Sequence, residues 1–264
     1  MNNPVVKRIV TALSTAALVV AALLALNRYC PQKAFLVISS VFIALVALVQ
    51  AEFYQMVRRT YAVMLFPGIL WGVVYLAGRC VLGCPGLLIV VVFALALTAL
   101  FGKYERPIEA FATTLLGFVY IPFMLASFLE VARDYGVVML LYIIALVKLS
   151  DMGGFAFGLA FGRHKMCPSI SPNKSWEGLA GSVLGSCLVS AAFMPLTGFP
   201  VVKALAFGVA AALLGTLGDL VESRMKRECA VKDSATFMPA GLGGFLDMFD
   251  SLIFAPALLF PFIR

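Results

Sequence analysis

Apolar stretches separated by short polar segments fill almost the whole chain, and their lengths predict its secondary structure. Roughly 17–25 consecutive apolar residues form a helix long enough to cross a bilayer, and by this rule the chain has about nine such helices. They are expected near residues 9–26, 34–57, 61–77, 86–101, 108–129, 136–161, 178–197, 201–221 and 247–263. The predicted fold class is therefore all-α, a polytopic integral membrane protein, because helices satisfy their backbone hydrogen bonds internally in lipid.

The first apolar stretch resembles a signal peptide, since Lys7 and Arg8 precede it. Its length argues against that interpretation, because the apolar core of a signal peptide has roughly 7–15 residues and this stretch runs from Ile9 to Leu26. No convincing small-residue cleavage site follows it. We expect a retained first transmembrane helix.

Composition excludes an ordinary soluble domain. Hydrophobic residues make up 62% of the chain and charged residues 12%, with a mean hydropathy of +1.03, whereas soluble domains have roughly 45–50% apolar and about 25% charged residues. The net charge of +7 does not indicate a nucleic-acid partner, because Lys and Arg in membrane proteins report topology and lipid contact. The six cysteines are scattered and His164 is the single histidine, and this pattern argues against a structural zinc site.

The distribution of basic residues predicts the orientation in the membrane. With the N-terminus in the cytoplasm, thirteen Lys and Arg residues fall on the cytoplasmic side and six on the other, which agrees with the positive-inside rule. The predicted location is the cell membrane, the inner membrane of a bacterium. The 162–177 loop and a polar segment at 219–251 then both face the cytoplasm.

The chain divides into two parts by the placement of its polar residues. Residues 1–135 form N-terminal membrane helices with little charge, which we interpret as scaffold and lipid-facing wall, and residues 136–264 form C-terminal membrane helices that carry the candidate chemistry. Small residues recur at helical spacing in the second part. They are Gly154, Gly158 and Gly162, then Gly178, Gly181 and Gly185. This spacing predicts close helix packing, and it also allows a homodimer.

The polar segment 219–251 holds six of the thirteen acidic residues. On a helix, the side chains that follow Asp219 at three- and four-residue spacing form one polar stripe. That stripe consists of Asp219, Glu222, Ser223, Lys226 and Arg227, and Asp247, Asp250 and Ser251 repeat the spacing after a glycine-rich turn. Carboxylates bind divalent metal ions, cations bind phosphate, and glycine-rich backbone admits anions. The combination indicates phosphoryl or nucleotidyl transfer, and the alternative is a salt-bridged cytoplasmic loop.

Two further groups are candidates. Lys148 and Asp151 are ionisable residues inside a predicted span, where they form either a structural ion pair or part of a substrate site. The loop GRHKMCPSISPNKSWE, from Gly162 to Glu177, is either a cationic anchor or a phosphate-binding loop. Ser175 and Glu177 are placed to cap the helix that follows it.

The polar segment 219–251 resembles the signature of the phosphatidate cytidylyltransferases (CDP-diacylglycerol synthases). That signature reads S-x-x-K-R-x(4)-K-D followed by P-G-H-G-G-x-x-D-R-x-D. The matching residues are Ser223, Lys226, Arg227, Lys232, Asp233, Gly241, Gly243, Gly244, Asp247 and Asp250. A second run, SPNKSWEG at 171–178, is similar to the family's S-P-K-K-T-W-E-G, and the resemblance extends over residues 145–264. Three positions depart from the signature: Ala240 replaces its proline, Leu242 its histidine and Met248 its arginine.

The resemblance implies transfer of a cytidylyl group from CTP to phosphatidic acid, giving CDP-diacylglycerol and pyrophosphate, with Mg²⁺ as cofactor. The implied catalytic residues are Asp219, Lys226, Arg227, Lys232, Asp233, Asp247 and Asp250. Asp219, Asp247 and Asp250 would be the metal ligands, for one ion or two. The implied substrate-binding residues are Ser171, Asn173, Lys174, Trp176, Glu222, Ser223, Gly241, Gly243 and Gly244. CTP, phosphatidic acid and membrane lipids are the expected partners. The phosphate of phosphatidic acid is already ionised, so the loss of the signature histidine at Leu242 is compatible with turnover.

Two alternatives stay open. A CTP-dependent lipid kinase, or a cytidylyltransferase for another lipid, would keep both motifs and differ in the lipid groove. A secondary transporter would place charges near the bilayer midplane on several helices, whereas this chain gathers them at one end of its last helices.

Overall fold

The computed structural model describes residues 25, 28–84, 86–231, 234 and 244–263. Most of the first predicted helix, near 9–26, lies outside the described residues. The same holds for two of the three signature departures, Ala240 and Leu242, and for several predicted site residues. These site residues are Lys232, Asp233, Gly241 and Gly243.

The described chain is a bundle of helices, which confirms the predicted fold class. The helices are α2 (Pro31–Val57), α3 (Leu65–Leu82), α4 (Leu87–Phe101), α5 (Pro107–Phe118), α6 (Met124–Asp134), α7 (Gly136–Phe161), α8 (Trp176–Thr197), α9 (Val201–Glu228) and α10 (Phe245–Leu259). A π-helical turn, η1 (Val119–Phe123), joins α5 to α6, and a 3₁₀ turn, η2 (Phe260–Phe262), follows α10. Because α5, η1 and α6 form one continuous span, Pro107–Asp134, the described part of the chain has seven helices long and apolar enough to cross a membrane, and α4 is a shorter apolar helix.

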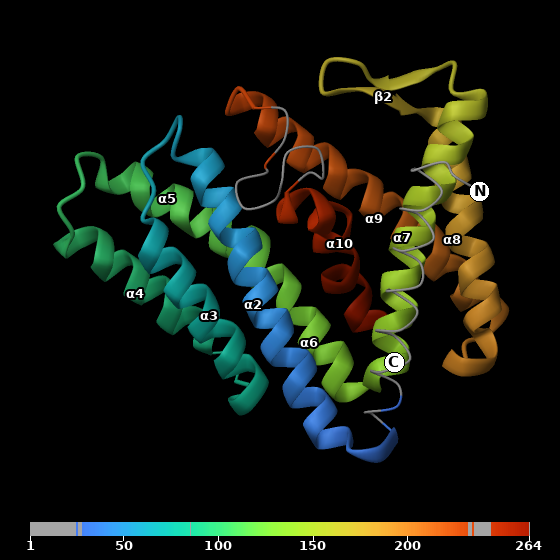
Figure 1. The fold of residues 1–264 in the computed structure, drawn as a ribbon, viewed down its shortest axis with the longest axis horizontal. Coiled ribbons are helices and arrows are strands. Elements are labelled where there is room, and N and C mark those ends of the chain that lie inside the picture. The colour runs from blue at the N-terminus through green and yellow to red at the C-terminus, as the bar shows by residue number, and fades with distance from the viewer. Residues whose placement is uncertain (1–24, 26–27, 85, 232–233, 235–243, 264) are drawn as a thin grey trace, which may run out of the picture.

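The helices alternate in direction, so their connections collect at two ends of the bundle (Figure 1). In that view the 58–64 connection, the 162–175 segment, the C-terminal end of α9 and the N-terminal end of α10 lie at the upper end. The turn between α6 and α7 and the 198–200 connection lie at the lower end. The two polar segments of the sequence are therefore on the same side of the bundle.

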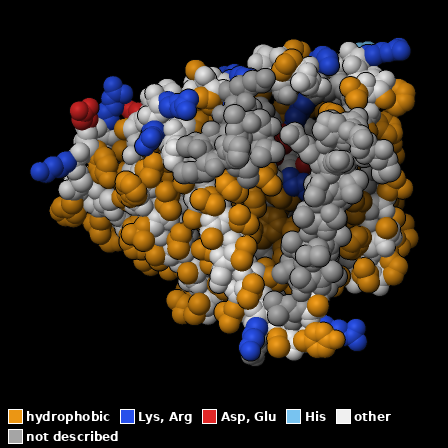
Figure 2. Space-filling view, in the orientation of Figure 1, with side chains coloured by type: hydrophobic (Ala, Val, Ile, Leu, Met, Phe, Trp, Pro, Cys, Tyr) orange, Lys and Arg blue, Asp and Glu red, His pale blue; other side chains and the backbone are white. Residues whose placement is uncertain are grey.

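The surface of the bundle is that of a multi-pass membrane protein. Hydrophobic side chains cover the middle of the face in Figure 2, with Lys and Arg side chains at its upper and lower edges. Phe66 is 82% exposed and Ile108 84% exposed. Exposed apolar area of this extent would be unfavourable in water and is expected in lipid.

Close packing of α7 on α8 confirms the prediction from the small residues. A Cβ atom on Gly153 would lie 2.4 Å from the backbone oxygen of Gly181, and one on Gly154 would lie 2.3 Å from Ser182 Oγ. Only glycine fits such contacts. The glycine-rich faces of the two helices thus pack against each other within one chain, and a homodimer stays a prediction.

The segment between α7 and α8 is a β-hairpin, where the sequence predicted only a loop. Strand β1 (Lys165–Cys167) pairs antiparallel with β2 (Ser171–Ser175), and they are the strands of the described chain. Ser175 ends the hairpin and caps α8 as predicted, because its hydroxyl accepts a hydrogen bond from the Gly178 N–H at 3.1 Å.

The hydrophobic core crosses from the N-terminal to the C-terminal helices. Helix α10 packs against α2 and α6 as well as α9. Its Phe249 faces Phe42 of α2 with ring centroids 6.5 Å apart, and its Phe254 faces Tyr120 of η1 at 5.9 Å. The helix that carries Asp247 and Asp250 is therefore positioned by both parts of the chain.

Candidate active site

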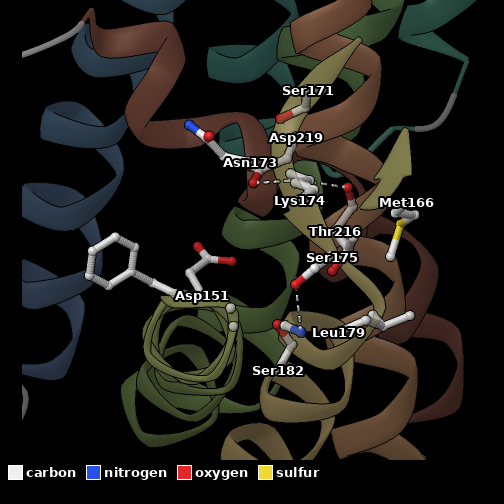
Figure 3. Close-up of a pocket in the computed structure, with 14 residues that line it drawn as sticks. Asp151, Met166, Ser171, Asn173, Lys174, Ser175, Leu179, Ser182, Thr216 and Asp219 are labelled. Carbon is white, nitrogen blue, oxygen red and sulfur yellow. Dashed lines mark hydrogen bonds and ion pairs between the residues drawn. The ribbon is translucent and has the colours of Figure 1, made fainter. Parts of the chain in front are cut away.

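The β-hairpin and helix α9 meet through a salt bridge. Lys174 on β2 places its Nζ 2.7 Å from Oδ2 of Asp219 on α9, and it also donates to the backbone oxygen of Thr216 at 3.1 Å. Figure 3 shows both contacts as dashed lines. The structure thus joins the two polar segments that the sequence analysis could place only on the same side of the membrane.

A cavity of about 280 Å³ opens beside this salt bridge, between α7, the hairpin, α8 and α9. Its polar lining includes Asp151, Ser171, Asn173, Lys174 and Asp219, and the labelled side chains in Figure 3 surround this space. The predicted substrate-binding residues of the hairpin therefore line a real cavity. Its glycine-rich wall leaves space because no side chain fills it.

Trp176, the remaining substrate-binding residue predicted next to the hairpin, is placed differently. Its side chain is 58% exposed at the start of α8 and is outside the set that lines the cavity. Such a position suits an aromatic side chain at the membrane interface.

Asp219 also meets Asp250 of α10. Their carboxyl groups interact directly with one another, and Gly218 allows this approach because a Cβ atom there would lie 2.3 Å from the backbone oxygen of Asp250. Two carboxylates in contact repel unless a cation or a proton lies near them. Lys174 supplies one positive charge, from the Asp219 side.

Asp247 belongs to a second group, centred on Lys226. The Nζ atom of Lys226 lies 2.6 Å from Glu222 Oε2 and 2.6 Å from Asp247 Oδ1. Asp247 Oδ2 accepts from the Gly244 N–H at 2.6 Å, at the N-terminal end of α10, where the helix dipole favours negative charge. Glu222, predicted to bind substrate, is completely buried beneath this group.

The other residues of the polar stripe lie at the edge of these groups. Arg227 is on an exposed part of α9 and Ser223 is half-buried. The helix continues to Glu228, past the predicted end at 221. This confirms that Asp219, Glu222 and Lys226 lie along one helix. Asp219 lines the cavity, whereas Lys226 lies between Glu222 and Asp247 of α10.

Lys148 and Asp151 connect α7 to α10. Lys148 Nζ lies 3.8 Å from Asp151 Oδ2 and donates to the backbone oxygen of Met248 at 2.8 Å and to Ser251 Oγ at 3.2 Å. Ser251 Oγ in turn donates to Asp151 Oδ2 at 2.8 Å. The structural ion pair is present, and Asp151 also lines the cavity, so a part in the substrate site stays a prediction.

The sequence analysis missed a contribution from α2. Glu52 is completely buried and accepts a hydrogen bond from the Leu246 N–H at 3.0 Å, in the first turn of α10. It had been assigned to the scaffold. The signal that could have found it is the cost of an ionisable residue inside an apolar span, which marks such residues as functional candidates.

The donor set of the site can be compared with the needs of Mg²⁺. The described residues contain no group of three or more His, Cys, Asp or Glu side chains arranged around a common metal position. Mg²⁺ is commonly held by one or two carboxylates together with substrate phosphates and water. The contacting pair Asp219 and Asp250 fits that pattern, and Asp247, engaged by Lys226, does not share the pair.

Comparison with known proteins agrees with this geometry. A family model described as "Cytidylyltransferase family" matches residues 6–264. A Staphylococcus aureus (strain COL) protein named phosphatidate cytidylyltransferase is 41% identical over 152 residues, covering 57% of this chain and 57% of the relative. A Staphylococcus saprophyticus protein of the same name is 39% identical over the same coverage.

The Escherichia coli (strain K12) protein YnbB is 39% identical over 130 residues, covering 49% of this chain and 43% of that protein. The matches thus span little more than half the length of the staphylococcal relatives, 57% in each case. The family model, in contrast, covers the chain from residue 6 to its end. The chain therefore belongs to the cytidylyltransferase family.

Proposed function

We propose that this protein transfers a cytidylyl group from CTP to phosphatidic acid, producing CDP-diacylglycerol and pyrophosphate. The observation that carries the proposal is the contact of Lys174 and Asp250 with Asp219 beside a cavity. Lys226 lies two turns after Asp219 on α9, and its partner Asp247 lies one turn before Asp250 on α10. Phosphate-binding cations and a carboxylate pair are the groups that this reaction needs. The names of the staphylococcal relatives support the same activity.

The protein has little covalent chemistry to perform in this reaction. An oxygen of the phosphatidate phosphate forms a bond to the α-phosphorus of CTP, and the bond from that phosphorus to the bridging oxygen of the β-phosphate breaks. Pyrophosphate leaves with the electron pair. Because the attacking phosphate is already ionised near neutral pH, no side chain has to remove a proton, and positioning and charge stabilisation dominate.

Lys174 and Lys226 are the described cations best placed to hold the phosphates. Both are mostly buried, with side-chain exposures of 20% and 13%, and in such surroundings a charge acts more strongly than in water. Asp219 and Asp250 are the residues that would hold Mg²⁺. When bound, Mg²⁺ supplies positive charge that neutralises the charge building on the transferring phosphorus and its leaving oxygen. Roles for Lys232, Asp233, Gly241 and Gly243 remain predictions from the signature.

A cation is present at one departure from the signature. The family has arginine where this chain has Met248, whose side chain is 50% exposed. Lys148 of α7 lies 2.8 Å from the backbone oxygen of Met248. The positive charge that the signature arginine would bring is thus replaced, within the same turn of α10, by a charge from another helix.

The proposed orientation places this site on the cytoplasmic side, where CTP is available. The connections at the site end include Arg58, Arg59, Lys103, Arg106, Arg163 and Lys165, and an excess of basic residues is typical of cytoplasmic loops. In a variant whose six native cysteines are replaced by serine, a cysteine introduced at Thr60 should react with a membrane-impermeant maleimide only in inverted vesicles. Labelling in right-side-out vesicles would contradict the orientation.

The reaction itself is tested with purified protein in detergent, phosphatidic acid and CTP labelled at the α-phosphate. We expect label in a lipid product and release of pyrophosphate. Formation of CDP with a candidate lipid alcohol would instead show phosphoryl transfer by a lipid kinase. The variant Asp250→Asn should lose turnover, and the control Asp134→Asn, which removes a carboxylate paired with Arg133 at the far end of α6, should keep it.

A further inference from the structure

Tyr120 carries a buried hydroxyl that the site described above does not use. It lies on the π-helical turn η1, in the N-terminal part of the chain, and its side chain is 5% exposed. Within the described part of the chain its hydroxyl has no hydrogen-bond partner. Buried polar groups without partners are uncommon in folded proteins, and π-helical turns occur frequently at functional sites.

The surroundings of the Tyr120 ring determine where this hydroxyl can act. The ring lies between Phe53 of α2 and Phe254 of α10, each with its ring centroid 5.9 Å away. A ring held on two sides cannot turn its hydroxyl toward solvent without moving α2 or α10. The position of the hydroxyl is therefore set by the same helices that position the carboxylates.

The ring contact with Phe254 links Tyr120 to the candidate active site, because Phe254 follows Asp250 by four residues and so lies on the same face of α10. Tyr120 lies within electrostatic range of Glu222, Asp250 and Asp219. Helix α10 packs against both α6 and α7, and these two helices also contact each other. Tyr120 thus lies on the η1 side of α10, whereas Lys174 contacts Asp219 from the hairpin.

We propose that the Tyr120 hydroxyl donates a hydrogen bond to a phosphate oxygen of a substrate held at Asp219 and Asp250. A neutral donor fits this position, because it binds an anionic oxygen without adding charge beside the carboxylates and lysines of the site. Hydrogen bonds to charged acceptors are the stronger ones. The phosphate can belong to the nucleotide or to the lipid headgroup. The identity of these ligands rests on the proposed function.

The variant Tyr120→Phe removes the hydroxyl and keeps the ring between its two phenylalanines. Hydrogen bonds to charged groups contribute about 1.5–3 kcal/mol, so we expect the KM of one substrate to rise about 10- to 100-fold. A rise for CTP alone assigns the contact to the nucleotide, and a rise for phosphatidic acid alone assigns it to the lipid. Equal rises for both place the hydroxyl where the two phosphates meet. Unchanged KM values for both substrates would overturn the proposal.

Tyr142→Phe is the matched control. Tyr142 is also fully buried, but its hydroxyl lies 2.7 Å from Ser190 Oγ, between α7 and α8. Its loss should lower the melting temperature and leave both KM values unchanged. Tyr120→Phe should show the opposite combination, an unchanged or higher melting temperature with weaker binding, because it removes a hydroxyl that has no partner among the described residues. A lower melting temperature with unchanged KM values would show that Tyr120 is only structural.

Binding measurements keep this test separate from that of the reaction. The rise in melting temperature is recorded with CTP and, separately, with dihexanoyl phosphatidic acid, for the wild type and for Tyr120→Phe. If the wild type is stabilised by either ligand but releases no pyrophosphate, the proposed reaction fails, and a smaller stabilisation of Tyr120→Phe still supports the contact. If the wild type turns over and both proteins are stabilised equally, the reaction stands and the Tyr120 proposal is wrong.

Discussion

Gly218 controls the distance between the two carboxylates of the site, and replacing it by alanine should separate them. A Cβ atom at this position would lie 2.3 Å from the backbone oxygen of Asp250 and 3.4 Å from Cα of Ser251. Non-bonded heavy atoms are most stable about 3.5–4.0 Å apart, so α9 and α10 must move apart by about 1 Å. A backbone oxygen cannot rotate away as a flexible side chain would. Overpacking of this kind costs about 1–3 kcal/mol of stability.

The effect of Gly218→Ala on turnover should exceed its effect on folding. A shift of about 1 Å in catalytic geometry costs about 100-fold in rate, and the shift acts directly between Asp219 and Asp250. Gly215 is the matched control. One turn earlier on α9, its added Cβ would lie 3.6 Å from Val147 and 3.7 Å from the Ser251 oxygen, which are ordinary contacts.

The assay measures CDP-diacylglycerol formation and thermal unfolding in detergent for both alanine variants. We expect Gly218→Ala to be folded and about 100-fold slower than the wild type, and Gly215→Ala to remain within about twofold of it. Equal activities of the two variants would refute the idea that close approach of α9 and α10 sets the geometry of the carboxylates.

Four further predictions concern the charged groups and the metal. Asp247→Asn should abolish turnover in a protein that still unfolds cooperatively, because the amide keeps an oxygen for capping α10 and loses the charge next to Lys226; an active variant would remove Asp247 from the catalytic set. Lys226→Met should destabilise the protein by about 3–5 kcal/mol in denaturant titrations, because Glu222 and Asp247 lose their shared cation. Glu52→Ala should cost about 1–3 kcal/mol through the unpaired N–H group in the first turn of α10, whereas Glu52→Gln, which keeps an acceptor, should unfold near the wild-type midpoint. EDTA should stop turnover and added Mg²⁺ restore it, and activity that persists in EDTA would exclude the metal.

The helices were predictable because each rests on one local property. A run of about 17–25 apolar residues is sufficient for a spanning helix, and every predicted span from 34–57 onward overlaps an observed helix. The polar stripe on α9 followed from helical spacing in the same way. The ends were less predictable: α9 continues from 221 to 228 because a polar stripe can remain helical after it leaves the apolar region.

The hairpin was missed because its strands carry no alternation of apolar and polar residues. Strand β2 reads SPNKS, a composition typical of loops. It is ordered by long-range contacts, such as the bond from Lys174 to the Thr216 oxygen on α9. A local pattern contains no information about such a partner, so the cavity beside the hairpin could not be predicted either.

The grouping of the carboxylates was only partly accessible from the sequence. The sequence analysis grouped Asp219, Asp247 and Asp250 as one set of metal ligands, but in the structure Asp219 contacts Asp250, whereas Asp247 pairs with Lys226. Which side of α10 faces α9 depends on packing across the bundle. The buried Glu52 is part of that packing, and its partner is 194 positions away in the chain.

The two lysines of the site also explain how it can hold so much charge before substrate arrives. Lys174 neutralises Asp219, and Lys226 lies between Glu222 and Asp247, so each group of carboxylates has its own cation within 2.7 Å. Substrate phosphates compete for the same lysines. If Asp219 and Asp250 held Mg²⁺, the ion would supply the positive charge that Lys174 now provides at Asp219, and Lys174 could bind a phosphate without leaving a buried carboxylate unpaired. Binding of the nucleotide and of the metal should therefore be cooperative, because each removes an electrostatic cost of the other.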